Sequence, residues 1–138
     1  MKFILNALVV MFISTCLWGC SSVKHTSNSG QPVTKNSEGW VGYVQTGKAS
    51  FYAHKHQAKR TASGELFDFK KNTAAHRKLP FGTKVRVTNM ENGKSVVVKI
   101  NDRGPFVKDR ILDLSQSAFS SIASTSSGII KVKIEVVE

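Results

Sequence analysis

The sequence predicts a small, mainly β domain that closes into a barrel. Residues 84–100 and 130–136 alternate apolar and polar side chains with a period of two, the pattern of half-buried strands. Residues 115–123 have the apolar spacing of a helix. Turn residues separate the segments, and the chain contains only 3 prolines. Many short strands with one or two short helices are typical of a small β-barrel.

The composition agrees with one folded domain. The chain has 138 residues, a formal net charge of +11 and 41% hydrophobic residues. It is too apolar for a disordered chain and too short for several separate cores. Its positive charge suggests an anionic partner, which could be a nucleic acid, a membrane surface or an acidic polysaccharide.

Residues 1–19 have the form of a secretory signal. An apolar run at residues 3–17 is short for a membrane-spanning helix. Residues 17–20 (LWGC) resemble the lipobox of bacterial lipoproteins, which makes Cys20 the expected lipidated residue and Cys16 the weaker alternative. The serine after Cys20 resembles an outer-membrane sorting signal. We therefore expect a lipid-anchored protein that faces the periplasm of a Gram-negative bacterium, from the outer membrane by the serine signal, and binds no nucleic acid. The alternatives are an uncleaved membrane anchor and an ordinary signal peptide that is cleaved at another position.

The remainder divides into a linker and a barrel. Residues 20–39 are rich in Ser, Thr, Asn and Lys and have no apolar periodicity, so we expect a flexible linker after the lipidated cysteine. Residues 40–138 form the predicted barrel domain. This domain contains no cysteine, so it cannot form a disulfide.

Three elements of the domain can be assigned from local patterns. Residues 84–100 form a hairpin whose turn is Asn92-Gly93. Residues 115–123 form a helix with Ser115 as its N-cap, and residues 130–136 form the last strand. The buried positions expected in these elements are Val85, Val87, Val96, Val98, Ile100, Ala118, Phe119, Ile122, Ile130, Val132, Ile134 and Val136.

Five segments, in order, resemble the rare lipoprotein A family. They are residues 47–52 (GKASFY), 61–68 (TASGELFD), 73–83 (TAAHRKLPFGT), 98–106 (VKINDRGPF) and 110–115 (RILDLS). The resemblance implies a six-stranded double-psi β-barrel. Expansins and some endoglucanases are similar more distantly, through the Asp-Leu-Ser segment.

The resemblance implies a lytic transglycosylase. Such an enzyme cleaves the bond between N-acetylmuramic acid and N-acetylglucosamine in peptidoglycan, preferring strands stripped of stem peptides, and leaves a 1,6-anhydro ring. Because the 6-hydroxyl of the sugar is the nucleophile, one carboxyl group can serve first as acid and then as base. Longer members carry a second, glycan-binding (SPOR) domain, and we expect this chain to act without one.

Four residues are the catalytic candidates by match to the family motifs. Asp102, in the Asp-Arg-Gly-Pro turn, is the first choice for the acid/base, and Asp113 is the second. Glu65 and His76 are expected to tune the pKa of that acid or to hold the substrate. The structural alternatives are that Asp102 caps a turn and that Asp113 stabilises the start of the helix.

Substrate-binding candidates combine an aromatic ring with positive charge. Tyr52 could stack on a sugar ring, whereas Phe67, Phe69 and Phe81 are expected in the core. A stripped strand exposes the lactyl carboxylate of each muramic acid, so cations could line the groove. The cationic candidates are Lys59, Arg60, Lys99, Arg103 and Arg110.

Other functions remain open on sequence alone. His54 and His56 could be a metal pair, but no third ligand is near, so we expect solvated loop residues, no metal and no cofactor. The main alternative to an enzyme is a non-catalytic module that binds or loosens the wall, as expansins do. A scaffold for division or envelope proteins is a third hypothesis. We expect a monomer.

Overall fold

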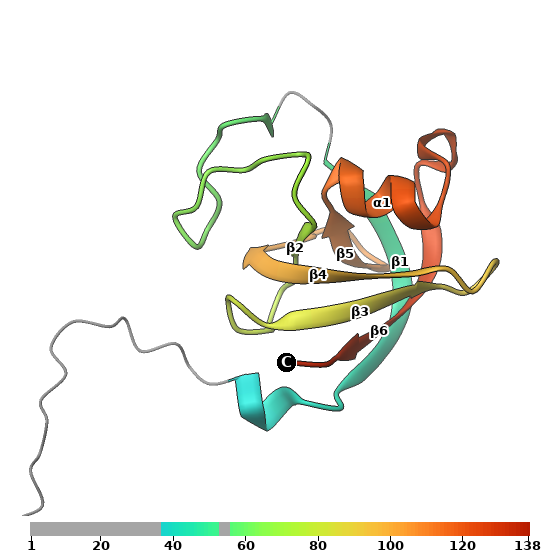
Figure 1. The fold of residues 1–138 in the computed structure, drawn as a ribbon, viewed down its shortest axis with the longest axis horizontal. Helices are drawn as coiled ribbons and strands as arrows, with labels where there is room; N and C mark the ends of the chain where they lie inside the picture. The colour runs from blue at the N-terminus through green and yellow to red at the C-terminus, as the bar shows by residue number, and fades with distance from the viewer. Residues whose placement is uncertain (1–36, 53–55) are drawn as a thin grey trace, which may run out of the picture. The chain divides into compact units, whose positions relative to one another are not determined.

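The computed structural model describes residues 37–52 and 56–138. The predicted signal sequence, Cys20, His54 and almost all of the predicted linker lie outside the described residues. Figure 1 shows a set of short strands curving around one core. The elements are η1 (Ser37–Trp40), β1 (Val44–Phe51), β2 (Thr73–Ala75), β3 (Lys84–Asn89), β4 (Ser95–Asp102), β5 (Arg110–Leu114), α1 (Gln116–Ile122), η3 (Thr125–Ser127) and β6 (Ile130–Val136).

The strands close into a barrel in the order β1-β5-β2-β4-β3-β6. β1 pairs in parallel with β5, and β2 pairs in parallel with β4. The other four neighbouring pairs are antiparallel. Two parallel pairs within a closed six-stranded barrel confirm the predicted double-psi β-barrel class.

Alternating positions of the strands fill the barrel interior. β6 follows the predicted pattern over its whole length, with Ile130, Val132, Ile134 and Val136 buried and Lys131 and Lys133 exposed. β3 and β4 form the predicted hairpin, and Gly93 in its turn has a φ of +72°, a conformation that favours glycine. Facing these residues are Leu112 and Leu114 of β5, which are also fully buried.

The helix α1 packs against β1, β4 and β5. The side-chain oxygen of Ser115 accepts a hydrogen bond from the Ala118 amide, as expected of an N-cap. Ala118, Phe119 and Ile122 face the core. The ring of Phe119 lies 4.7 Å from that of Phe51 at the end of β1, so the helix fixes the strand end that leads to Tyr52.

The expectation that three phenylalanines belong to the core holds in part. Phe67 is buried, whereas Phe69 and Phe81 are only half-buried. Phe81 packs against the core cluster from outside. Phe69 lies in the loop between β1 and β2, where no strand alternation directs a side chain inward. Among residues 37–52 and 56–138, no helix is long and apolar enough to cross a membrane.

Candidate active site

Four residues stand side by side across four neighbouring strands. Ser50 of β1 is in register with Asp113 of β5, Asp113 with Ala75 of β2, and Ala75 with Asp102 of β4. Residues in register point to the same face of a sheet, and neighbouring strands lie about 4.8 Å apart, which places the two aspartate α-carbons about 10 Å apart. Ala75 of β2 lies between them in this register.

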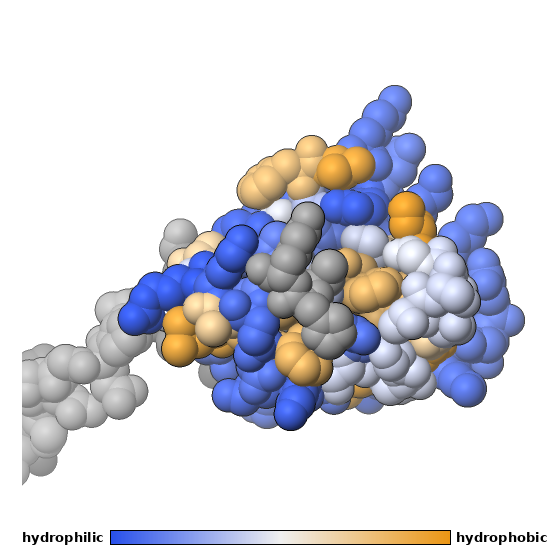
Figure 2. All heavy atoms as spheres, turned by 90° about the horizontal axis from the view of Figure 1, so that it is seen from above, coloured by the Kyte–Doolittle hydropathy of each residue, from blue (hydrophilic) through white to orange (hydrophobic). Residues whose placement is uncertain are grey.

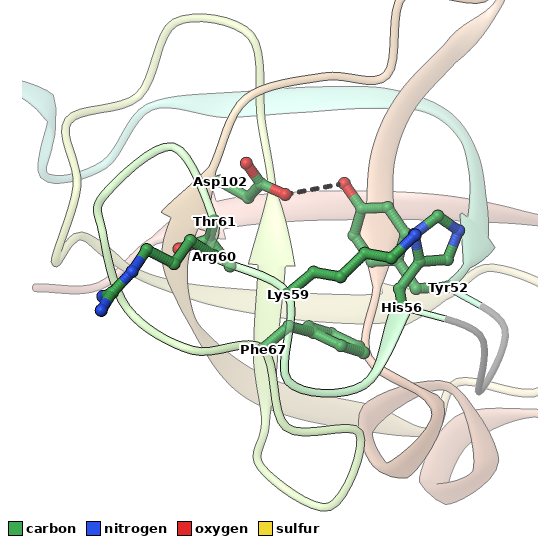
Figure 3. A pocket seen from close by; sticks show the side chains of 7 residues that line it. All are labelled: Tyr52, His56, Lys59, Arg60, Thr61, Phe67 and Asp102. Carbon is green, nitrogen blue, oxygen red and sulfur yellow. Dashed lines mark hydrogen bonds between the residues drawn. The ribbon is translucent and has the colours of Figure 1, made fainter.

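The carboxylate of Asp102 is held by three donors. Its Oδ1 accepts hydrogen bonds from the amides of Ala62 at 2.9 Å and Arg103 at 2.8 Å. Its Oδ2 accepts one from the Tyr52 hydroxyl at 3.2 Å, drawn as the dashed line in Figure 3. Two backbone amides and a phenol hydroxyl thus fix the orientation of this carboxylate.

A cavity of about 120 Å³ lies beside Asp102. Figure 3 shows Lys59 extending across it toward Tyr52 and His56, with Phe67 below. The residues that line it are Tyr52, His56, Lys59, Arg60, Thr61, Phe67 and Asp102. A carboxylate, a phenol and a lysine that share one small cavity suit a polar ligand group.

Tyr52 connects the two acids electrostatically. Burial raises the pKa of Tyr52 far above its ordinary value, and the negative charges of Asp102 and then Asp113 raise it further. The phenol therefore stays protonated and donates to Asp102 throughout the neutral range. The ring is held edge-on by Phe67, with 5.4 Å between centroids.

Asp113 has a more enclosed environment than Asp102. Its side chain is buried and accepts a hydrogen bond of 2.6 Å from the Ser50 hydroxyl. Arg110 lies 3.4 Å away through its Nε. Asp113 does not line the cavity beside Asp102. The geometry thus favours Asp102 as the group that reaches a ligand, and Asp113 as a charge behind it.

Glu65 does not contact Asp102. Its carboxylate pairs with Lys99 Nζ at 2.8 Å and accepts a hydrogen bond from Asn101 Nδ2 at 3.1 Å. The hydrogen bond from Lys99 is the main cause that lowers the pKa of Glu65. Burial opposes it, and the Asn101 amide lowers the pKa further. Glu65 therefore fastens the loop of residues 60–66 to β4, and the same loop supplies the Ala62 amide that binds Asp102.

His76 is buried, and its ring makes hydrogen bonds away from the Asp102 cavity. Its Nδ1 accepts hydrogen bonds from the amides of Lys78 at 3.1 Å and Leu79 at 3.0 Å. Burial, followed by the charges of Arg77, Arg103 and Lys78, lowers the pKa of His76 to about 4. At neutral pH the imidazole is therefore uncharged, and only its backbone amide contacts Asp102, through the carbonyl oxygen at 3.2 Å.

The predicted cations do not form one groove. Lys59 and Arg60 line the cavity, but the Arg60 guanidinium points away from Asp102 in Figure 3 and donates to the Gly64 carbonyl at 2.9 Å. Lys99 is paired with Glu65, and Arg110 lies beside Asp113.

Arg103 also has partners inside the protein. Its Nη1 donates to the carbonyls of His76 at 3.2 Å and Leu79 at 2.9 Å. Its guanidinium stacks on Phe81 at 3.8 Å from the ring centroid. These contacts tie the β2–β3 connection to the end of β4. The side chain thereby supports the backbone that carries Asp102.

Sequence analysis did not predict three of the cavity residues: His56, Thr61 and Phe67. The His56 ring lies 5.4 Å from Tyr52, which places this histidine in the cavity rather than in solvent. No local signal identifies it, because its place depends on a loop that folds back over β4. Within the described parts of the chain, no three His, Cys, Asp or Glu side chains are grouped to hold a metal.

The surface around the site is polar. Figure 2 looks down on the side of the barrel that carries α1 and the loop of residues 56–70. On this face hydrophilic side chains predominate, and hydrophobic ones appear in small separate groups. Such a face suits a polar polymer better than an apolar partner.

Comparison with known proteins identifies the family. Residues 44–134 match the family described as lytic transglycolase. The chain belongs to this family. The endolytic peptidoglycan transglycosylase RlpA of Pasteurella multocida is 45% identical over 105 residues, which are 76% of this chain and 36% of that relative. RlpA of Pseudomonas aeruginosa is 46% identical over 96 residues, 70% of this chain and 28% of the relative.

The match covers one part of those relatives. The chain spans about a third of the length of the curated family members it matches. Among solved structures, the Streptomyces papain inhibitor is similar with a TM-score of 0.59 and 24% identity, covering 71% of this chain and 97% of that one. At this identity the likeness shows the shared barrel fold alone.

Proposed function

We propose that the chain is a lytic transglycosylase of peptidoglycan that cleaves the bond between N-acetylmuramic acid and N-acetylglucosamine. The observation that carries this proposal is the rigid carboxyl group of Asp102 beside a cavity, in a barrel of the lytic transglycolase family. Its RlpA relatives are named for this activity. We further propose that peptide-stripped strands are preferred, because their lactyl carboxylates would face Lys59.

In the proposed reaction, Asp102 acts twice. The reaction starts from the protonated form of Asp102, whose proton passes to the glycosidic oxygen as the bond from that oxygen to C1 of muramic acid breaks. The 6-hydroxyl oxygen of the same sugar then bonds to C1, and its proton passes to the Asp102 carboxylate. The cycle restores the acid and consumes no water, so one carboxyl group suffices.

Three hydrogen-bond donors stabilise Asp102 between the two proton transfers. After the first proton transfer Asp102 carries a negative charge, which the Ala62 amide, the Arg103 amide and the Tyr52 hydroxyl stabilise.

We also propose that Cys20 carries the lipid anchor and that the domain faces the periplasm from the outer membrane. The sequence around Cys20 and the peptidoglycan named as the substrate of the RlpA relatives support this location. Metabolic labelling with a palmitate analogue tests it: wild type should be labelled and Cys20→Ser should not.

The activity is tested by incubating the full-length chain with amidase-stripped peptidoglycan and measuring soluble anhydro-muropeptides by mass spectrometry. Asp102→Asn should abolish the products, because the amide cannot donate the proton. Asp109→Asn is the matched control, since it makes the same chemical change outside the cavity at a residue with a φ of +67°, which asparagine tolerates. Binding to the glycan without products from wild type would support a non-catalytic wall-binding module instead.

A further inference from the structure

A second cavity, of about 200 Å³, has no part in the mechanism above. It opens near the start of β1 and beyond the end of β2. Its lining residues are Tyr43, Gln45, His76, Arg77, Lys78 and Ile111. None of them lines the cavity beside Asp102.

The hydrogen bonds of this cavity fix the orientation of Gln45. Because Nδ1 of His76 accepts hydrogen bonds from the amides of Lys78 and Leu79, it carries no proton, and the proton of the neutral ring is on Nε2. Nε2 therefore donates to Oε1 of Gln45 at 3.2 Å. The Tyr43 hydroxyl donates to the same oxygen at 3.3 Å.

Two N–H donors of Gln45 are consequently unused. With Oε1 held by two donors, the amide nitrogen Nε2 is the other end of the side chain. Among residues 37–52 and 56–138, none accepts a hydrogen bond from this nitrogen. A half-buried amide group with free donors is a site for a carbonyl or hydroxyl oxygen of a ligand.

The cavity also carries positive charge and an apolar wall. Lys78 is exposed and has no carboxylate within 4.0 Å in the described part of the chain. Arg77 donates from Nη2 to the Arg110 carbonyl at 2.7 Å, which holds its guanidinium at the rim. The Tyr43 ring and the Ile111 side chain supply the apolar surface.

The position of the cavity links it to the acids. His76 directly follows Ala75, the residue between Asp102 and Asp113. Arg77 contacts the backbone of Arg110, whose side chain pairs with Asp113. Ile111, which lines the cavity, lies two residues before Asp113 on β5. A saccharide strand bound across Asp102 and Asp113 would therefore reach this cavity next.

We propose that this cavity is a subsite for an N-acetylated sugar that bears a carboxylate, such as a muramoyl residue of a stripped strand. The acetamido carbonyl accepts hydrogen bonds from Nε2 of Gln45. The carboxylate faces Lys78 and Arg77, and the apolar face of the sugar packs on Tyr43 and Ile111. The inference rests on the proposed function for the choice of polymer.

Gln45→Glu provides a sharp test. The new carboxylate can still accept hydrogen bonds from Tyr43 and His76, so the local fold is preserved, while both N–H donors are lost. Full-length chains that also carry Asp102→Asn are titrated with stripped glycan oligosaccharides, N-acetylated or chemically N-deacetylated, and the two dissociation constants are compared. Gln57→Glu is the matched control, because Gln57 is exposed and its Oε1 accepts a hydrogen bond outside the cavity, from the Phe69 amide.

We expect the parent and the Gln57→Glu control to bind the N-acetylated ligand about tenfold more tightly than the deacetylated one, the value of one well-made hydrogen bond. Gln45→Glu should reduce that ratio to one or below. Equal ratios in all three proteins, or no measurable binding by the parent, would overturn the subsite. Thermal unfolding of each variant checks that the fold is intact.

The same proteins separate the two proposals. If the parent discriminates the acetyl group but the chain with Asp102 intact releases no anhydro-muropeptides, the subsite stands and the transglycosylase fails. If anhydro-muropeptides appear and Gln45→Glu keeps the full binding ratio, the transglycosylase stands and the subsite fails.

Discussion

The buried, neutral His76 should make the stability of the domain depend on pH. The pKa of His76 falls from 6.5 to about 4 in the folded protein. Between these values the unfolded chain binds a proton that the folded protein does not, so acid favours unfolding. Stability is therefore fully present above about pH 7 and is lost as the pH falls through 6.5 toward 4.

The size of the effect follows from the two pKa values. At pH 4.5 the unfolded imidazole is almost fully protonated and the folded one is mostly neutral. The linkage relation then gives a loss of roughly 2.5 kcal/mol relative to pH 8. For a urea m-value of about 1–2 kcal/mol/M, the unfolding midpoint would fall by about 1.3–2.5 M.

His76→Asn isolates this contribution, because asparagine keeps an acceptor near the position of Nδ1 and does not titrate. Urea unfolding is measured for both proteins at pH 8.0 and 4.5, in the same ionic strength. The wild-type protein should lose about 2.5 kcal/mol more than the variant between these pH values. Parallel losses in the two proteins would refute the assignment of a buried, neutral His76.

Three further changes test the packing and electrostatics of the barrel. Ser50→Ala leaves the buried Asp113 without its 2.6 Å hydrogen bond and should lower the free energy of unfolding by about 1–3 kcal/mol in urea titrations. Gly47→Ala places a Cβ 2.6 Å from Ile111 Cγ2, so it should lower the free energy of unfolding by about 1–3 kcal/mol. In the double variant with Ile111→Ala, the loss should be smaller than the sum of the two single losses. Glu65→Gln should lower the melting temperature slightly at pH 7 and leave it unchanged below pH 3. The reason is that a carboxyl group with a lowered pKa in the folded protein stabilises the fold only while it is ionised. An equal effect at both pH values would contradict the ion pair.

Local patterns in the sequence were sufficient for the elements with clear periodicity. The predicted strand at residues 130–136 matches β6 at both ends, and the predicted helix with its Ser115 cap matches α1. β2 could not be found in this way, because its three residues are all buried and show no alternation. The parallel pairing of β2 with β4 depends on tertiary packing and leaves no mark in a local window.

The candidate site was likewise predictable from the sequence only in part. The family motifs selected Asp102 and Tyr52, which the structure brings within 3.2 Å of each other. Motif matching could not show that Arg103 turns toward backbone carbonyls, because the direction of a long side chain depends on acceptors elsewhere in the fold. His56 enters the cavity only because the following loop returns across β4, which no spacing in the sequence encodes.

The central claim is that Asp102 transfers a proton without activating water. The most direct measurement is digestion of stripped peptidoglycan by the full-length chain in water enriched in ¹⁸O, followed by mass spectrometry of the new sugar ends. The account predicts 1,6-anhydro ends that contain no ¹⁸O and that disappear in Asp102→Asn. Reducing ends that carry one ¹⁸O would identify a hydrolase, and anhydro ends that persist in Asp102→Asn would contradict the role of this residue.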